Sequence, residues 1–317
     1  MFMKKIVLIR RNGLGDFIAG MIPLCNYLQK IYDKCEFFFF MSEANSALVK
    51  YFFPNAHVIV IPNGNKYIQT LTTALKFRHI KPDIGISAMP DYVKLNTLFL
   101  FAIGAKDNYG RITNKIFSKV INHPYICSDV NDLFKYHVGL ASLKFFDCNI
   151  NEISKDIYPK FNKKLITPYK PESEAPYIMV EISNNRPTSQ LSNNKIAEIF
   201  NYLYKQHSFS VLITAKHADR EKADALKSIL NMGAEVYITQ NIHDFISFVN
   251  AADIVLCGDG GIGHMSGALD KKTVALYGQT SVVHWGILAD QVTHLYDSED
   301  VNNIPDKDII DAVAAYL

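Results

Sequence analysis

Near the start of the chain, an aspartate follows two glycines at the end of a short apolar run. Residues 10–17 read Arg-Arg-Asn-Gly-Leu-Gly-Asp-Phe, in which Gly13 and Gly15 permit a tight turn from a strand into a helix. Asp16 falls at or near the start of that helix. A carboxylate there lies at the carboxyl edge of a parallel sheet, where α/β proteins bind ligands, and could remove a proton from a hydroxyl group. Aspartate is equally a favoured N-cap that stabilises a helix by about 1 kcal/mol, so the spacing leaves both roles open.

The same loop also partly matches the dinucleotide fingerprint Gly-x-Gly-x-x-Gly. Gly13 and Gly15 supply the first two glycines, but Ile18 stands at the third position. An acidic residue, Asp33 or Glu36, follows about twenty residues later, as the fingerprint requires. A nicotinamide-dependent oxidoreductase is therefore one alternative.

A second candidate site lies in residues 249–280. The short apolar run 254–257 is followed by a glycine-rich turn, and the residues of that turn are Gly258, Asp259, Gly260, Gly261, Gly263 and His264. Residues 265–269 then begin a helix, and 273–277 form the next strand. A strand, a glycine-rich turn and a helix start present backbone N–H groups and a positive helix end to a phosphate. The sequence therefore predicts a phosphorylated ligand here.

This second loop matches Gly-x-Gly-x-x-Gly literally, but the acid that the fingerprint wants after the next strand is missing. That strand ends at Leu276-Tyr277-Gly278-Gln279, which contains no carboxylate. We therefore expect the loop to hold phosphate rather than a dinucleotide. His264 either donates a hydrogen bond to ligand oxygens or is a packed core histidine.

Length and composition restrict the class of protein. The 317 residues suffice for two domains, and the 49% hydrophobic and 20% charged content predicts a sizeable core. A net charge of +2 is too weak to suggest nucleic-acid binding. Five dispersed cysteines without a Cys-x-x-Cys pair predict reduced thiols and a cytoplasmic protein. The apolar runs fall far below the roughly 20 residues of a membrane span, so any membrane contact is expected to be peripheral.

Strand signals alternate with helical signals, which favours an α/β fold with parallel sheets. In the first half we predict strands at 5–9, 36–41, 57–61 and 84–87 and helices at 16–31, 45–53, 67–77, 95–103 and 135–146. A linker rich in Lys and Pro follows at 157–176. The second half has predicted strands at 177–181, 210–214, 235–238, 254–257 and 273–277 and helices at 195–206, 219–231, 243–251, 265–269 and 306–317. We expect two doubly wound domains, 1–165 and 166–317, facing a central cleft, with a last helix that can pack back on the first.

Taken together, the motifs resemble glycosyltransferase family 9, the bacterial heptosyltransferases that build lipopolysaccharide cores. The family carries Asp-Ser/Thr-Gly-x-x-His, then an Ala-Ala-Leu-like helix and a Val-Ala-Leu-Phe-Gly-x-Thr-like strand. The matching segments here are 259–264, 266–269 and 274–280. The family also opens with a strand and Gly-Asp, matched by Gly15 and Asp16, and a proline seven residues later, matched by Pro23.

The resemblance implies a GT-B architecture of two Rossmann-like domains, the first binding the acceptor and the second the nucleotide sugar. Asp16 would be the general base, and in-line attack would invert the sugar carbon. Asp259, Gly260, Gly261 and His264 would contact the donor, which in this family is ADP-heptose, for transfer to a lipopolysaccharide-type or other glycan acceptor. No metal is implied, because a helix N-terminus and positive side chains can stabilise the leaving diphosphate.

The chain departs from the family pattern at two donor positions. Gly260 replaces the Ser/Thr, and Ser189 stands where the family has a lysine that contacts the donor phosphates. Arg186 could supply that charge, because a guanidinium suits a diphosphate. Ser183 and Lys216 are further donor-side candidates, although an exposed helix start explains Lys216 equally well.

On the acceptor side the candidates are Gly15 and Asn12 in the first loop and Lys94 and Arg111 in the basic stretch 94–119. This stretch could meet an anionic acceptor such as a phosphorylated lipid core at the inner face of the bacterial inner membrane, or it could be a solvated surface. The alternatives are a GT-B enzyme that uses another nucleotide sugar or a protein acceptor, and a catalytically degenerate GT-B binding module.

Overall fold

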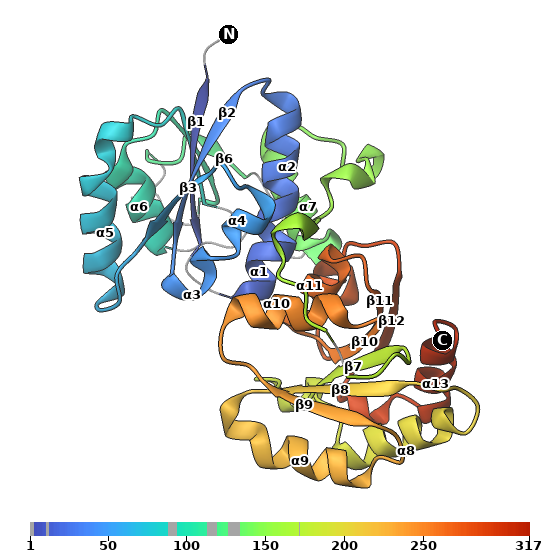
Figure 1. The fold of residues 1–317 in the computed structure, drawn as a ribbon. Helices are drawn as coiled ribbons and strands as arrows, with labels where there is room; N and C mark the ends of the chain where they lie inside the picture. Colours follow the sequence, from blue (N-terminus) through green and yellow to red (C-terminus); the bar gives the residue numbers. More distant parts are fainter. Residues whose placement is uncertain (1–2, 11–12, 88–93, 113–118, 126–133, 171) are drawn as a thin grey trace. The chain divides into compact units, whose positions relative to one another are not determined.

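The computed structural model describes the chain except residues 1–2, 11–12, 88–93, 113–118, 126–133 and 171 (Figure 1). Its internal contacts divide the chain into two units, Met1–Pro159 and Lys160–Leu317. This division lies within the predicted linker, a few residues before the boundary expected from the sequence. Each unit is built on one parallel sheet.

The sheet of the first unit has the strand order β3-β2-β1-β4-β5-β6. Its strands are β1 Lys4–Arg10, β2 Cys35–Met41, β3 His57–Val60, β4 Ile84–Ile86, β5 Asp107–Gly110 and β6 His123–Pro124. All neighbouring strands in this order run parallel. The winding direction reverses between β1 and β4, and ligands of doubly wound sheets bind at the carboxyl ends of strands beside such a reversal.

Helices cover both faces of the first sheet (Figure 1). Its helical segments are α1 Leu14–Asp16, a π-helical turn Phe17–Met21, α2 Ile22–Ile31, α3 Glu43–Ser46, α4 Val49–Phe52, α5 Lys66–Lys76, α6 Lys94–Ile103 and α7 Val138–Ala141. Alternate residues of a strand point to opposite faces. Phe38 and Phe40 of β2 accordingly join a buried cluster with Phe99 of α6, whereas Phe39 meets Phe17 edge to face. The phenylalanine run of β2 thus supplies core on both sides.

The second unit repeats the topology, with the strand order β12-β11-β10-β7-β8-β9. Its strands are β7 Tyr177–Glu181, β8 Ser210–Ala215, β9 Ala234–Ile238, β10 Ile254–Gly258, β11 Lys272–Gly278 and β12 Val292–Asp297. Its helices are α8 Asn193–Tyr204, α9 Arg220–Ile229, α10 Ile242–Ala251, α11 Gly261–Ala268, α12 Val282–Trp285 and α13 Asp306–Ala314. Here the reversal lies between β7 and β10.

Polar caps fix where several of these helices begin. The Asn65 side chain accepts hydrogen bonds from the N–H groups of Tyr67 and Ile68 before α5. Ser192 accepts from Lys195 at the start of α8, and Asn241 accepts from Asp244 at the start of α10. Each cap satisfies a backbone donor that has no partner within its helix.

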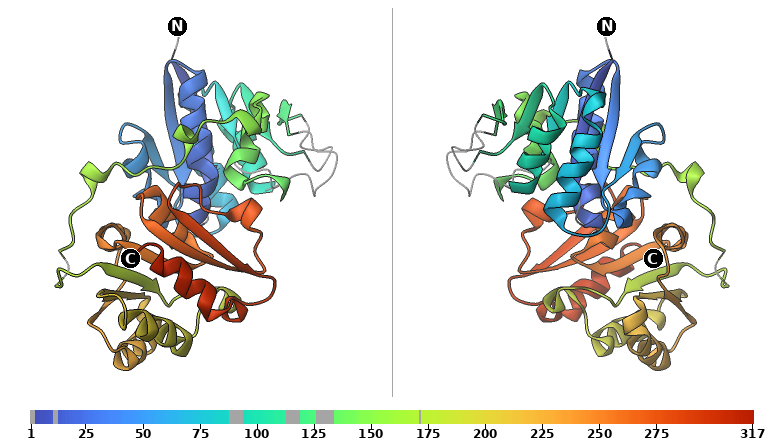
Figure 2. Two further views of the ribbon diagram at one scale, coloured as in Figure 1. Left: turned by 90° about the vertical axis from the view of Figure 1, so that its right-hand side faces the viewer. Right: turned by 90° about the vertical axis from the view of Figure 1, so that its left-hand side faces the viewer.

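The structure adds and moves some elements relative to the sequence predictions. Strands β5, β6 and β12 and helix α12 were not predicted, and α11 begins at Gly261 rather than at residue 265. Helix α13 packs on α8 within the second unit (Figure 2), where Ile309 and Val313 join the core. Among the described residues, no helix is both long and apolar enough to cross a membrane.

Candidate active site

Asp16 stands at the carboxyl end of β1, directly before the π-helical turn. Arg10, the last residue of β1, holds it through an ion pair of 2.7 Å between Nη2 and Oδ2. The Arg10 side chain is 11% exposed and that of Asp16 is 31% exposed, so solvent and small molecules still reach the carboxylate. Gly13 has a positive φ of 54°, and a Cβ there would overlap the Asp16 carboxylate. The sequence thus places a fixed, accessible carboxylate at the reversal of the first sheet.

The π-helical turn explains why Pro23 follows Asp16 in a helix. In a regular α-helix the ring of Pro23 would clash with the carbonyl of Ala19. The turn is instead widened, with the N–H of Ile22 donating to the carbonyl of Phe17. Gly139 of α7 packs on the Ala19 carbonyl so closely that a Cβ would overlap it. Such widened turns recur beside functional sites.

Two more strands bring basic residues to the same edge. Lys94 is the exposed first residue of α6, and half-buried Arg111 directly follows β5. Gly15 precedes Asp16 in α1, and Asn12 lies outside the described residues. Not all of the basic stretch 94–119 lies at this edge, because Lys106 directly precedes β5 and is therefore at the opposite edge of the sheet.

The acids of the dinucleotide alternative lie at that opposite edge too. Asp33 precedes β2 and Glu36 is its second residue, whereas the glycine loop follows the carboxyl end of β1. Glu36 forms a 2.7 Å contact between its Oε1 and Nε2 of His57. Neither acid can reach a ribose bound at Gly13, so the nicotinamide interpretation of this loop is wrong.

In the second unit the glycine-rich turn is shorter than the sequence suggested. Only Asp259 and Gly260 connect β10 to α11. The first N–H groups of a helix lack partners within it and form its positive end, and Gly260 has no side chain to cap them. Gly263 and Gly267 lie inside the helix, where side chains would collide with Ile287. The predicted phosphate site is thus the N-terminus of α11 itself.

Arg186, in the loop after β7, reaches this helix end. Its Nη1 forms an ion pair with Oδ2 of Asp259 and lies 3.3 Å from Oγ1 of Thr280. Asn184 supports the pair, accepting from the Arg186 N–H at 3.0 Å and donating to the Asp259 carbonyl at 2.9 Å. The Asp259 side chain is 5% exposed, but that of Arg186 is 58% exposed. A cation is therefore anchored beside the helix end while remaining open to a ligand.

Ser189, at the position of the family lysine, does not present its side chain to a ligand. It is completely buried, and its carbonyl covers Gly258 so closely that a Cβ there would overlap it. The carbonyl of Thr188 covers Gly278 in the same way. The turn Pro187–Ser189 therefore seals the carboxyl ends of β10 and β11, and Arg186 supplies the exposed charge.

The other donor-side candidates are partly committed to structure. The Ser183 hydroxyl donates to Oδ2 of Asp219 at 2.5 Å and accepts from the Lys216 N–H at 2.9 Å. Lys216 is exposed, and its Nζ donates to Oδ1 of Asn185 at 2.6 Å. His264 is only 6% exposed in the first turns of α11, which favours the packed alternative.

Glu181, the last residue of β7, is a further titratable group at this edge of the sheet that no sequence motif marks. Burial raises its pKa to about 7, and the positive charge of Lys216 opposes this shift. Burial, together with the charges of Glu181 and Asp259, also raises the pKa of Cys257. The signal was a single acid that ends an otherwise apolar strand, next to the reversal of the second sheet.

The raised pKa of Glu181 predicts that stability falls as the pH rises. Between its ordinary value of 4.5 and about 7, the folded chain keeps a proton that the unfolded chain has released. Folding therefore loses up to about 1.4 kcal/mol per pH unit across that window. Urea unfolding at several pH values should show this decline in the wild type and a much smaller one in Glu181→Gln. The exposed Glu198→Gln should behave as the wild type, and parallel profiles for all three chains would refute the assignment.

Residues 131–315 match the model of glycosyltransferase family 9 (heptosyltransferase). The chain is 20% identical over 293 residues to lipopolysaccharide heptosyltransferase 1 of Campylobacter coli, covering 87% of this chain and 84% of that protein. The structure of E. coli ADP-heptose lps heptosyltransferase II has a TM-score of 0.79 at 14% identity, covering 98% of each chain.

A structure of E. coli heptosyltransferase WaaC with ADP has a TM-score of 0.76 at 12% identity, covering 99% of this chain and all of that one. These likenesses confirm the expected GT-B fold with its two parallel sheets. Within the described parts of both units, no three His, Cys, Asp or Glu side chains gather in a way that could hold a metal ion. With more than half of its length matched by the family model, the chain belongs to glycosyltransferase family 9, the heptosyltransferases, and is a glycosyltransferase.

Proposed function

We propose that this glycosyltransferase transfers heptose from ADP-heptose to a lipopolysaccharide-type acceptor, with inversion at the sugar carbon. The first unit binds the acceptor and the second binds the donor. One observation carries the proposal: the reversal of each sheet holds a group that the reaction needs. The first has the accessible carboxylate of Asp16, and the second has the α11 N-terminus with the exposed guanidinium of Arg186. The names of the relatives, which include ADP-heptose and lipopolysaccharide, support this choice.

The proposed reaction is one displacement. Asp16 takes the proton of the acceptor hydroxyl as its oxygen attacks the anomeric carbon, and the bond from that carbon to the diphosphate breaks. ADP leaves with the bonding electrons. The N–H groups at the start of α11 and the Arg186 guanidinium stabilise the charge that develops on the diphosphate. Asp259, Gly260 and Gly261 form the helix end on which the donor rests.

The acceptor half of the proposal uses the carboxyl edge of the first sheet. Lys94 and Arg111 follow β4 and β5 there, close in the topology to Gly15 and Asp16. Their charges suit an anionic glycolipid. We assign Asn12 to the same site from its place in the sequence. The enzyme would act in the cytoplasm, in peripheral contact with the inner membrane.

A second candidate function is transfer of a different sugar from another nucleotide. Two observations favour it: Gly260 brings no hydroxyl to the start of α11, and Ser189 is buried rather than presenting a charge. The fold and the proposed roles of Asp16 and Arg186 would be unchanged in this case.

Thermal unfolding in the presence of ADP, UDP, GDP, CMP or NAD tests the donor. A ligand that binds only the folded state raises Tm, and at one hundred times its Kd it adds about 2.7 kcal/mol of stability. We expect a selective shift with ADP, followed by product formation from ADP-heptose. A selective shift with UDP or GDP would transfer the proposal to the second candidate, and a shift with NAD alone would overturn both. If the chain turned over none of the nucleotide sugars, it would be a catalytically degenerate binding module.

The same titration locates the site. Arg186→Met should weaken ADP binding by about ten- to a hundredfold, because a charge-assisted contact to phosphate is lost. Arg220→Met, which changes an exposed arginine on α9, is the matched control and should bind as the wild type. Equal ADP affinity for all three chains would remove Arg186 from the donor site.

A further inference from the structure

Helices α5 and α6 carry large apolar side chains that face away from the core of the first unit. Ile68 and Leu75 of α5 are 58% and 56% exposed, and Phe101 of α6 is 67% exposed. Monomeric proteins rarely leave several such side chains together in water without a function for them.

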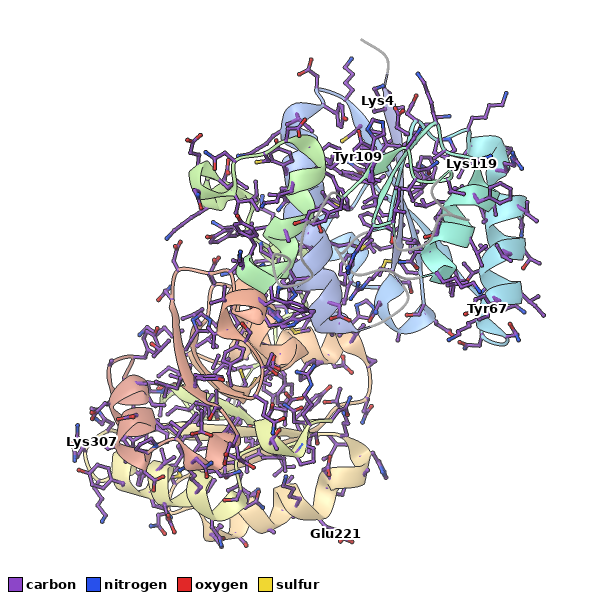
Figure 3. The ribbon with its side chains drawn as sticks, turned by 180° about the vertical axis from the view of Figure 1, so that it is seen from behind. Lys4, Tyr67, Tyr109, Lys119, Glu221 and Lys307 are labelled. Carbon is purple, nitrogen blue, oxygen red and sulfur yellow. The ribbon has the colours of Figure 1, made fainter. Side chains whose placement is uncertain are left out.

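Helical spacing places these side chains on the outer surface of the helical layer. Ile68, Thr72 and Leu75 stand at i, i+4 and i+7, on the stripe opposite buried Thr73 and Ala74. On α6 the exposed positions Lys94 and Phe101 are likewise seven residues apart, while Phe99 and Leu100 are buried against the sheet. The two helices pack side by side on the same face of the sheet (Figure 1), and Tyr67 projects from the N-terminal end of α5 (Figure 3).

Basic residues stand at the ends of the two helices that carry these apolar side chains. The sequence from residue 44 to residue 82 contains no Asp or Glu, and α6 contains none either. The exposed lysines and arginines at the ends of the two helices are Lys66, Lys76, Arg78, Lys81 and Lys94. The Arg78 guanidinium lies against Gly104, just after α6, where a Cβ would stand 3.2 Å from its Nε. A positive rim therefore spans the ends of both helices.

We propose that this α5–α6 surface, made of Ile68, Leu75, Phe101 and their basic rim, docks on an anionic phospholipid bilayer. The apolar side chains would enter the boundary between headgroups and acyl chains, and the lysine and arginine side chains would contact lipid phosphates. A second copy of the chain is a poorer occupant, because it would bring one basic rim against another. This inference rests on the proposed function at one point: Lys94 belongs both to the α5–α6 surface and to the proposed site for a lipid-linked acceptor.

Vesicle flotation with the full chain tests the proposal. We expect binding to phosphatidylcholine vesicles that contain about 30% phosphatidylglycerol, little binding to pure phosphatidylcholine, and a loss of binding as salt is added. Ile68→Ser, Leu75→Ser and Phe101→Ser together should lower the partition coefficient at least about tenfold. Lys66→Glu and Lys76→Glu should each lower it at least about fivefold, the effect of losing one basic contact.

The matched control changes exposed residues of the second unit, Tyr202→Ser, Ile229→Ser and Lys205→Glu, which should leave flotation unchanged. Unfolding curves confirm that each variant is folded. Equal flotation of surface and control variants would overturn the proposal. So would a wild-type chain that does not float but forms a dimer, if Phe101→Ser dissociates that dimer. Flotation needs neither donor nor acceptor. A chain that floats but has no transferase activity would therefore support the membrane surface and contradict the proposed function. A chain that is active but never floats would support the proposed function and contradict the membrane surface.

Discussion

Asp16→Asn is expected to reduce kcat about a thousandfold and to leave donor affinity unchanged. General bases typically contribute about 10²- to 10⁴-fold to a rate, and an amide has the shape of the carboxylate but cannot accept the proton. The Asn side chain can still accept a hydrogen bond from Arg10, whose Nη2 lies 2.7 Å from Oδ2 of Asp16. The loop should therefore keep its geometry. The measurement is transfer from ADP-heptose under saturating donor, with ADP binding followed in parallel by calorimetry.

The matched control is Asp33→Asn, because Asp33 is an exposed aspartate of the same unit that lies before β2 at the opposite edge of the sheet. It should retain wild-type turnover. If the Asp16 variant turned over within about twofold of the wild type, a role as general base would be excluded. If both kcat and ADP affinity collapsed, the substitution would be acting through folding instead.

Gly258→Ala is expected to destabilise the second unit by about 3 kcal/mol or more, a large fraction of the roughly 5–15 kcal/mol that holds a protein folded. The new Cβ would overlap the carbonyl oxygen of Ser189 and stand 2.9 Å from its carbonyl carbon. These are backbone atoms of the turn that carries Arg186, so they cannot move without displacing it. Urea unfolding should show the loss of stability, and ADP binding should weaken with it.

Gly260→Ala is the control at the neighbouring glycine of the same loop. Gly260 is extended, with φ of 175°, and a Cβ there would lie 3.7 Å from Nδ2 of Asn184, an ordinary contact. The free energy of unfolding of the Gly260→Ala variant should stay within about 0.5 kcal/mol of the wild-type value. Equal stability of the Gly258 and Gly260 variants would show that the turn Pro187–Ser189 does not press on β10 in solution.

Local patterns in the sequence determined the architecture and the chemical candidates. Buried parallel strands such as β1 and β10 are continuous apolar runs, and the helices between them have amphipathic spacing, so the alternation of two βα series is visible in short windows. Asp16 and Asp259 are recognisable as site candidates because each follows such a strand, and the carboxyl ends of parallel strands share one edge. The family motifs pointed to the same residues.

Only the tertiary structure decided the elements and contacts that depend on distant partners. Strand β5 reads Asp-Asn-Tyr-Gly, which has no strand pattern, and it exists because it pairs with β4. Glycine disfavours helices by about 1 kcal/mol relative to alanine, yet α11 starts at Gly261 because its glycines allow close packing on Ile287. Arg186 pairs with Asp259 across 73 residues, and Ser189 is buried by the same turn. Periodicity and turn chemistry act over a few neighbouring residues, whereas burial, ion pairing and a raised pKa arise from groups that meet only when the chain is packed.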